Sequence, residues 1–314
     1  MKELTVCFIG IGSIARRHIR NLRKICKETN IELNIDAVRR NPPADAEKVE
    51  LGLRNVYTDI QHSGAFYDAI FITNPTEYHL TALQSSVNHS NHFFVEKPVV
   101  SVSQMDKVTI DTYNPDALYY VACPLRYNAV IQYIKENVDL SQVVSVRSIS
   151  SSYLPDWRPG IDYRNTYSAK KALGGGVSID LVHEWDYLTY LFGKPEKIQC
   201  MIGKKSNLEI DSDDYAIYLA EYSDKIVELH LDYFGRKTIR EIMLITKEDT
   251  IVGDIVNQQI VFLNSGKTIS FCEDRDDYQI RELRFFLGLL NGKEPEESNI
   301  QHAINVLKLT QGIV

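Results

Sequence analysis

The chain has 314 residues, of which 44% are hydrophobic and 25% are charged, and its formal net charge is −7 at pH 7. This length exceeds that of one typical domain, so we expect two domains of ordinary globular composition. The negative charge argues against nucleic acid or an anionic membrane as the main partner. Five cysteines without a C-x-x-C pair indicate neither a disulfide framework nor a metal site, and no run approaches the ~18 apolar residues that a membrane span needs. We therefore expect a cytoplasmic protein without a bound metal.

The first predicted elements are an apolar strand, a glycine turn and a helix over residues 14–26. Gly10 and Gly12 allow the backbone to approach an anion, and the start of the helix presents free N–H groups and the positive end of its dipole. Ala15 stands at the third small position of the G-x-G-x-x-G/A dinucleotide fingerprint. The pattern favours a dinucleotide site, although a glycine turn between any strand and helix produces the same three residues by chance.

The second predicted strand, residues 31–38, is followed by Arg39 and Arg40. In dinucleotide-binding folds a carboxylate at this place binds the ribose 2′-hydroxyl of NAD, whereas arginine accommodates the 2′-phosphate of NADP. Asp36 is the nearest acid, but it lies inside the strand, two residues before its end. The two arginines therefore favour NADP(H), with NAD(H) as the alternative.

The rest of the first half alternates between short strands and helices, which is typical of a parallel α/β sheet. We predict helices at 46–53, 78–88 and 104–112, and strands at 55–57, 69–73, 92–95 and 118–122. Polar loops at 74–79 and 96–98 follow two of these strands, and ligands in such sheets bind beyond the carboxyl ends of the strands. We expect both loops to face the cofactor, and we expect this dinucleotide-binding domain to occupy residues 1–122.

The second half, residues 123–314, has the pattern of an α+β domain with a large, mostly antiparallel open sheet. Its predicted helices are 130–137, 178–191, 277–290 and 300–309. Its predicted strands are 143–151, 197–202, 216–222, 226–234, 240–246, 250–254, 259–263 and 268–273. A long irregular stretch separates the first strand from the helix at 178–191.

Four motifs stand in a fixed order along the chain: Gly10-Ile-Gly12-Ser-Ile-Ala15, Thr73-Asn74-Pro75-Thr76 with His79, Glu96-Lys97-Pro98, and Gly174-Gly175-Gly176 followed by Asp180, His183 and Asp186. In this order they resemble the Gfo/Idh/MocA oxidoreductases over nearly the whole chain. The resemblance implies a Rossmann domain and an open-sheet domain that together oxidise or reduce hydroxyl and carbonyl carbons, mostly of sugars and polyols. It also implies a homo-oligomer, dimer or tetramer, that packs through the C-terminal sheet.

The resemblance assigns roles to individual residues. Lys97, His183 and Asp180 are the expected catalytic residues, with Lys97 at the reacting hydroxyl and His183 as a proton carrier. The expected cofactor-binding residues are Gly10, Gly12, Ser13, Ile14, Ala15, Asn74, Pro75, Thr76, His79, Glu96 and Lys97, together with Arg39 and Arg40, although Arg39 replaces the acid that the family commonly has after strand two. The usual D-x-x-x-H spacing is not kept, because Asp180 and His183 are three residues apart and Glu184 stands at the usual histidine position. On one helix either residue would share the face of Asp180.

Residues 153–171 form a loop rich in tryptophan, tyrosine, arginine and lysine, a composition suited to stacking on a sugar and pairing with a carboxylate or phosphate. We expect the loop to bind substrate, or alternatively to be a solvated basic loop that packs its aromatic rings on the sheet. The expected substrate-binding residues are Arg126, Trp157, Arg158, Tyr163, Arg164, Tyr167, Asp180 and His183.

The sequence thus predicts an NAD(P)-dependent oxidoreductase that transfers a hydride between nicotinamide and a carbinol or keto carbon of a sugar derivative, such as a nucleotide sugar or sugar acid. A polyol or inositol dehydrogenase is the alternative within the enzyme class. A non-catalytic NAD(P)-binding sensor on the same fold is the alternative outside it.

Overall fold

The computed structural model describes residues 2–41, 45–109, 113–114, 116–294 and 298–314. The chain divides into two compact units, one of residues 1–122 and 279–304 and the other of residues 123–278 and 305–314. Residues 279–304 are predicted to lie in the second domain, whereas they belong to the first unit. Pro42, Pro43 and the end of the helix predicted at 104–112 lie outside the described residues.

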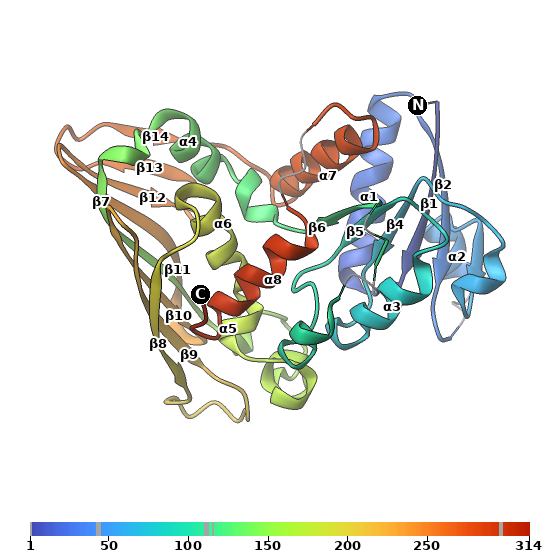
Figure 1. The fold of residues 1–314 in the computed structure, drawn as a ribbon, viewed down its shortest axis with the longest axis horizontal. Helices are drawn as coiled ribbons and strands as arrows, with labels where there is room; N and C mark the ends of the chain where they lie inside the picture. The colour runs from blue at the N-terminus through green and yellow to red at the C-terminus, as the bar shows by residue number, and fades with distance from the viewer. Residues whose placement is uncertain (1, 42–44, 110–112, 115, 295–297) are drawn as a thin grey trace. The chain divides into compact units, whose positions relative to one another are not determined.

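The first unit is built on a parallel sheet of six strands in the order β3-β2-β1-β4-β5-β6, as predicted for a Rossmann-type fold. Its strands are β1 Glu3–Ile9, β2 Glu32–Val38, β3 Asn55–Tyr57, β4 Ala69–Ile72, β5 His92–Val95 and β6 Leu118–Val121. Its helices are α1 Ser13–Glu28, α2 Asp45–Glu50, α3 His79–Ser86 and α7 Asp277–Leu290, which enters from the second unit (Figure 1). The order reverses between β1 and β4, and this switch point is where open α/β sheets bind ligands.

Aromatic rings form much of the core of the first unit. Phe71 of β4 stacks on Phe8 of β1 at 4.6 Å and on Phe94 of β5 at 5.1 Å between ring centroids. Phe286 of α7 meets the edges of Phe71 and Phe94 at 5.6 and 5.3 Å. All four rings are fully buried. Helix α7 therefore completes this core from a distant part of the sequence.

The second unit is built on an eight-stranded sheet in the order β14-β13-β12-β11-β7-β10-β9-β8, in which the β10–β7 pair is parallel and the other pairs are antiparallel. The strands are β7 Val143–Tyr153, β8 Lys197–Gly203, β9 Tyr215–Glu221, β10 Ile226–Asp232, β11 Phe234–Thr246, β12 Thr250–Asp254, β13 Gln259–Phe262 and β14 Thr268–Ser270. The helices are α4 Ala129–Asn137, α5 Val177–Asp180 and α6 Val182–Phe192, and α8 Ile300–Leu309 ends in this unit. Figure 1 shows α4, α5 and α6 on one face of the sheet.

Alternate side chains of β9 show that one face of this sheet is buried and the other is exposed to solvent. Ala216, Tyr218 and Ala220 are buried, whereas Ile217 and Leu219 between them are exposed. This period of two is the pattern of an antiparallel sheet with one solvated face. The predicted fold class is thus confirmed in both units.

Several predicted elements differ from the structure, and three of them differ in their geometry. The helix predicted at 178–191 is two helices, because Leu181 leaves helical geometry with φ −97° and ψ 26°. The strand predicted at 240–246 begins at Phe234, and its pairing with β7 shifts register between Phe234 and Ile239. Residues 102–107 form the 3-10 helix η3 Val102–Lys107 where an α-helix at 104–112 is predicted. Within the described part of the chain, no helix has the length and apolarity to cross a lipid bilayer.

Candidate active site

The glycine turn between β1 and α1 has one crowded position and one open position. Gly10 has φ +90°, and a Cβ there would lie 2.6 Å from the Cα of Asn74. A Cβ on Gly12 would meet nothing within 4 Å. Ser13 and Ile14 begin α1, and Ala15 is fully buried against the sheet. The turn therefore presents open space and the N-terminus of a long helix, a combination that suits the pyrophosphate of a dinucleotide.

The loop after β4 packs directly on this turn. The Thr73 hydroxyl donates to the Gly10 carbonyl at 2.8 Å, and Pro75 and Thr76 lead into the 3-10 helix η2 Thr76–Tyr78. His79, at the start of α3, is buried with Nε2 2.9 Å from the Asn74 carbonyl and Nδ1 3.0 Å from the Pro98 carbonyl. Burial lowers the pKa of His79, and the hydrogen bonds to these carbonyls oppose that effect only in part. His79 thus ties the loop after β4 to the loop after β5.

The loop after β5 carries Lys97, which precedes a cis peptide bond to Pro98. Glu96 accepts from the Lys97 backbone N–H at 3.3 Å through Oε2, and its Oε1 lies 2.6 Å from His18 Nε2. Burial alone would raise the pKa of Glu96, but the hydrogen bond and charge of His18 lower it on balance. His18 lies on α1 and its side chain is 1% exposed. Helix α1 is therefore linked to the loop that holds Lys97.

No sequence pattern predicts a role for His18, because its partner Glu96 lies 78 residues away. The only local signal is its position one helical turn after Ala15, on the buried face of α1. A pairing of this kind is a tertiary contact, and the helical periodicity gives no information about which residue fills it.

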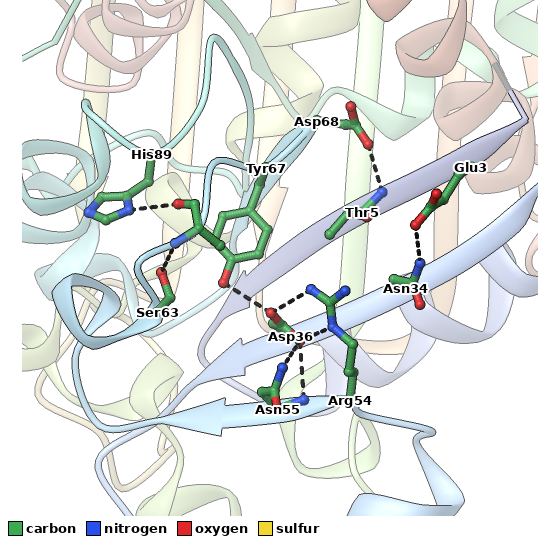
Figure 2. Close-up of polar contacts among 11 residues, drawn as sticks. Glu3, Thr5, Asn34, Asp36, Arg54, Asn55, Ser63, Tyr67, Asp68 and His89 are labelled. Carbon is green, nitrogen blue, oxygen red and sulfur yellow. Dashed lines mark hydrogen bonds and ion pairs between the residues drawn. The ribbon is translucent and has the colours of Figure 1, made fainter.

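Asp36 is fully buried and its carboxylate is enclosed by donors (Figure 2). Arg54 binds it through Nε at 3.0 Å and Nη2 at 2.9 Å, Asn55 donates its backbone N–H at 3.1 Å and Tyr67 donates its hydroxyl at 3.1 Å. The carboxylate thereby links β2, β3 and the segment before β4 through its hydrogen bonds. It does not extend to the end of β2, where a ribose would lie.

The residues that follow β2 are basic. Arg39 Nη1 donates to Glu47 Oε1 of α2 at 2.8 Å, and Arg16 of α1 pairs with the same carboxylate oxygen. The Arg40 guanidinium lies 5.9 Å from the centre of the Tyr78 ring. The end of this strand therefore offers two guanidinium groups, one of them held in place by Glu47.

In the second unit, Asp180 at the end of α5 accepts a hydrogen bond from the Tyr233 hydroxyl at 2.5 Å. Tyr167 is also close to this carboxylate. Burial, and then the Asp180 charge, raises the pKa of Tyr233, so this tyrosine stays a protonated donor at neutral pH. Gly175 precedes α5 in contact with the backbone of the loop, because a Cβ there would lie 2.0 Å from the Tyr167 carbonyl oxygen. The structure thus brings Tyr167 and Asp180 close together.

The break at Leu181 places Asp180 and His183 on different helices, so the expectation of a single helix over 178–191 that carries both is wrong. His183 keeps 14% of its side chain exposed, whereas Glu184 is fully buried. Glu184 Oε1 is ion-paired with Arg240 Nε of β11 at 2.9 Å. Between the two candidates for the histidine position of the motif, His183 is the one that solvent reaches.

The other expected substrate residues lie in different surroundings. Arg126 is buried, and its Nε and Nη2 both donate to Asp186 at 2.8 Å. The exposed Arg164 pairs with Asp162 and, at 2.6 Å, with Glu209, and hydrogen bonds from it to both carboxylates raise its pKa. These ion pairs occupy the guanidinium groups that a bound anion would have to recruit.

The loop over 153–171 has little regular structure, as expected, and contains the 3-10 turns η7 Leu154–Asp156, η8 Tyr163–Asn165, η9 Tyr167–Ala169 and η10 Lys171–Leu173. A small hollow in it is lined by Leu154, Pro155, Trp157, Arg158, Ile161, Tyr163, Thr166 and Ser168. Trp157 donates to Ser152 at 2.9 Å and packs edge-on against Tyr233, and Arg158 lies 5.6 Å from the centre of the Tyr167 ring. Trp157 is therefore fixed from both sides, and Arg158 is held over an aromatic ring.

Comparison with protein families identifies both halves of the chain. Residues 4–112 match the model of the oxidoreductase family with an NAD-binding Rossmann fold, and residues 131–244 match the Gfo/Idh/MocA C-terminal domain. The chain belongs to the Gfo/Idh/MocA oxidoreductase family. The resemblance inferred from the four motifs is thereby confirmed, and the first unit is an NAD-binding Rossmann domain.

Solved structures of this family share the fold at low sequence identity. UDP-N-acetylglucosamine 3-dehydrogenase GnnA from Acidithiobacillus ferrooxidans is 18% identical with a TM-score of 0.79, over 100% of this chain and 97% of that one. Levoglucosan dehydrogenase in complex with NADH is 16% identical with a TM-score of 0.81, over 99% and 96% of the two chains. An oxidoreductase from Thermotoga maritima is 18% identical with a TM-score of 0.82, over 99% and 95%. A search of curated protein sequences gives no match.

Proposed function

We propose that this Gfo/Idh/MocA oxidoreductase transfers a hydride between a nicotinamide cofactor and a carbinol or keto carbon of a sugar derivative. The observation that carries the proposal is the placement of Lys97 beyond the carboxyl end of β5, in a loop anchored by His18 through Glu96 and by His79 through the Pro98 carbonyl. A surface lysine needs no such support, whereas a reacting group must be held in a fixed place. Two structural neighbours act on UDP-N-acetylglucosamine and levoglucosan, which favours a sugar-derived substrate.

The first unit fits a dinucleotide. Space around Gly12 and the N-terminus of α1 would take the pyrophosphate, and the segment Asn74–Thr76 would line the nicotinamide side. When bound, the nicotinamide ring supplies the hydride acceptor or donor. The residues of the chain hold it there and keep its ring against the substrate.

Lys97 and His183 are the proposed groups that act on the substrate oxygen, one by exchanging its proton and the other by polarising it. Asp180, fixed by Tyr167 and Tyr233, is the proposed partner of a substrate hydroxyl. Trp157 and Arg158, in the hollow of the loop, are the proposed wall for the sugar or its anionic group.

We also propose that the cofactor is NADP(H) in preference to NAD(H), because Asp36 is locked in the sheet and Arg39 and Arg40 follow β2. In Arg39→Ala, the Kd for NADP⁺ should rise at least tenfold, since a hydrogen bond to a charged group contributes about 1.5–3 kcal/mol. The Kd for NAD⁺ should change by less than about threefold, which is within ordinary surface effects. Titration calorimetry with both nucleotides measures this, with Arg147→Ala in the second unit as the control. Tighter binding of NAD⁺ than NADP⁺ to the wild type would contradict the preference.

Steady-state assays with NADPH and a panel of keto-sugars and sugar nucleotides test the reaction itself. Lys97→Ala should lower kcat by about 10² or more while the protein stays folded, because it removes a group that acts on the proton in the transition state. Lys107→Ala, in the 3-10 helix η3, is the matched control. Cofactor binding without turnover on any substrate, and no effect of Lys97→Ala, would instead support the sensor.

The exposed face of the eight-stranded sheet is the proposed surface for self-association. Met201, Ile217, Leu219 and Ile226 are exposed there. We expect a dimer or tetramer at micromolar concentration, which sedimentation measures, and a monomer would contradict it.

A further inference from the structure

A polar cluster in the second unit joins helix α6 to strand β11. Arg240 Nη2 lies 3.0 Å from His183 Nε2, and Arg240 Nε lies 2.9 Å from Glu184 Oε1. Arg240 Nε also donates to the Ser150 hydroxyl of β7 at 3.3 Å. One guanidinium therefore contacts the proposed proton carrier and its buried neighbour from a strand 57 residues later in the chain.

The contact between Arg240 and His183 restricts where the imidazole proton lies. A guanidinium has only N–H donors and keeps its charge at any pH a protein tolerates, so Nε2 must be the acceptor. An imidazole that accepts at Nε2 is neutral and carries its proton on Nδ1. A protonated ring would set an N–H of His183 against an N–H of Arg240.

Glu184 is the group that could favour the other tautomer. Its Oε1 lies 3.5 Å from His183 Nε2, at the limit of hydrogen bonding, and an acceptor there would attract a proton to that nitrogen. The same oxygen lies 2.9 Å from Arg240 Nε, which offsets its charge. Glu184 is also next to the buried Tyr187, whose hydroxyl lies 2.6 Å from the Ser148 hydroxyl. The shorter contact, from Arg240, therefore decides the state of Nε2.

We propose that Arg240 is a positioning residue that holds His183 as a neutral imidazole with its proton on Nδ1. The consequence for the reaction rests on the proposed function. While Arg240 contacts Nε2, this nitrogen accepts no proton from the substrate. His183 then polarises the substrate oxygen as a hydrogen-bond donor. The proton that leaves or enters the substrate hydroxyl is then exchanged with Lys97. Besides His183, the cluster contains Glu184 and Tyr187 on α6 and Arg240 on β11 as charged or titratable groups.

The ring nitrogens of His183 report this state directly. In full-length protein labelled with ¹⁵N-histidine and free of substrate, the His183 signals are assigned by their loss in His183→Asn. We expect Nδ1 to have the chemical shift of a protonated nitrogen and Nε2 that of an unprotonated one from pH 6 to 8. The Nδ1–H form should exceed the other by about tenfold, the effect of one charge-assisted hydrogen bond.

Substitutions then test whether Arg240 is the cause. Arg240→Met should move the proton to Nε2, and Arg240→Lys, which keeps a cationic donor, should restore the Nδ1–H form in part. Because Arg240→Met leaves Glu184 buried without its cation, the double variant Arg240→Met/Glu184→Gln is compared with Glu184→Gln alone. Arg236→Met is the matched control. This arginine lies on the same strand and is exposed, and its described contact is with the Tyr153 ring, 3.9 Å from the ring centre, and not with the cluster of His183 and Glu184.

A proton on Nε2 in the wild type, comparable populations of the two tautomers, or unchanged shifts in the variants without Arg240 would overturn the proposal. These samples contain no substrate, so the result for Arg240 and His183 does not depend on whether the protein reduces sugars. If turnover exists, kcat should fall in the double variant relative to Glu184→Gln while KM changes little, and Arg240→Lys should recover part of kcat.

Discussion

His79 shows how a single buried residue can hold two loops. Both ring nitrogens face carbonyl oxygens, yet a neutral imidazole has only one N–H to donate. Protonation would satisfy both carbonyls, but burial dominates and lowers the pKa of His79. The ring is therefore neutral at pH 7, and the folded state is stabilised only while it stays neutral.

This lowered pKa predicts a pH dependence of stability. The unfolded chain binds the His79 proton more readily than the folded chain does, so its contribution is complete above about pH 6.5 and is lost as the pH falls through the folded pKa. His79→Gln should lower the free energy of unfolding at pH 8 by about 1–3 kcal/mol, the cost of a lost buried hydrogen bond. The difference from wild type should shrink between pH 6.5 and pH 5. Urea unfolding at a series of pH values measures it, with the exposed His62→Gln as control, and a difference that grows in acid would contradict it.

At the scale of elements, the turn between β1 and α1 and the loop after β4 form one packed unit. The contact of Gly10 with the Asn74 backbone sets how closely the two approach, whereas Gly12 contributes only open space. One glycine therefore serves the fold, and the other leaves room for a ligand.

These two glycines predict opposite phenotypes. Gly10→Ala should cost roughly 2 kcal/mol or more of stability, because it combines a left-handed φ with a backbone collision. Gly12→Ala should cost under about 1 kcal/mol, as at an ordinary N-cap, but should weaken dinucleotide binding at least tenfold, because its methyl group fills the phosphate space. Thermal unfolding and calorimetric titration with NADP⁺ and NAD⁺ measure the two effects. Wild-type cofactor affinity in Gly12→Ala would contradict a phosphate site at this turn.

At the scale of the whole molecule, the chain enters the first unit twice. Residues 279–304 return to it after the second unit, and Phe286 of α7 fills the space beside Phe71 and Phe94. The nucleotide-binding unit is thus incomplete at residue 122.

Truncation is therefore expected to fail at the boundary that the sequence indicates. A fragment of residues 1–122 should lack a cooperative thermal transition by circular dichroism, whereas the same fragment joined by a flexible linker to 279–304 should show one. In the full chain, Phe286→Ala should cost about 3–5 kcal/mol as a core truncation. Phe66→Ala, at an exposed ring, should change stability by less than about 0.5 kcal/mol. Cooperative unfolding of the 1–122 fragment alone would show that α7 is dispensable.

The sequence by itself determines the two kinds of sheet, the glycine turn and the family, because periods of 2 and 3.6 residues and short motifs are local properties. It also places Lys97 at the end of a strand. Only the tertiary structure decides that Asp36 is ion-paired with Arg54, that His18 contacts Glu96 and that Arg240 contacts His183. The roles of the individual site residues stay predictions. Each of these contacts joins residues 18 to 78 positions apart, and no local pattern specifies which distant side chain fills a buried polar position. The break at Leu181 is likewise seen only in the tertiary structure, because the helical periodicity of the sequence continues through it.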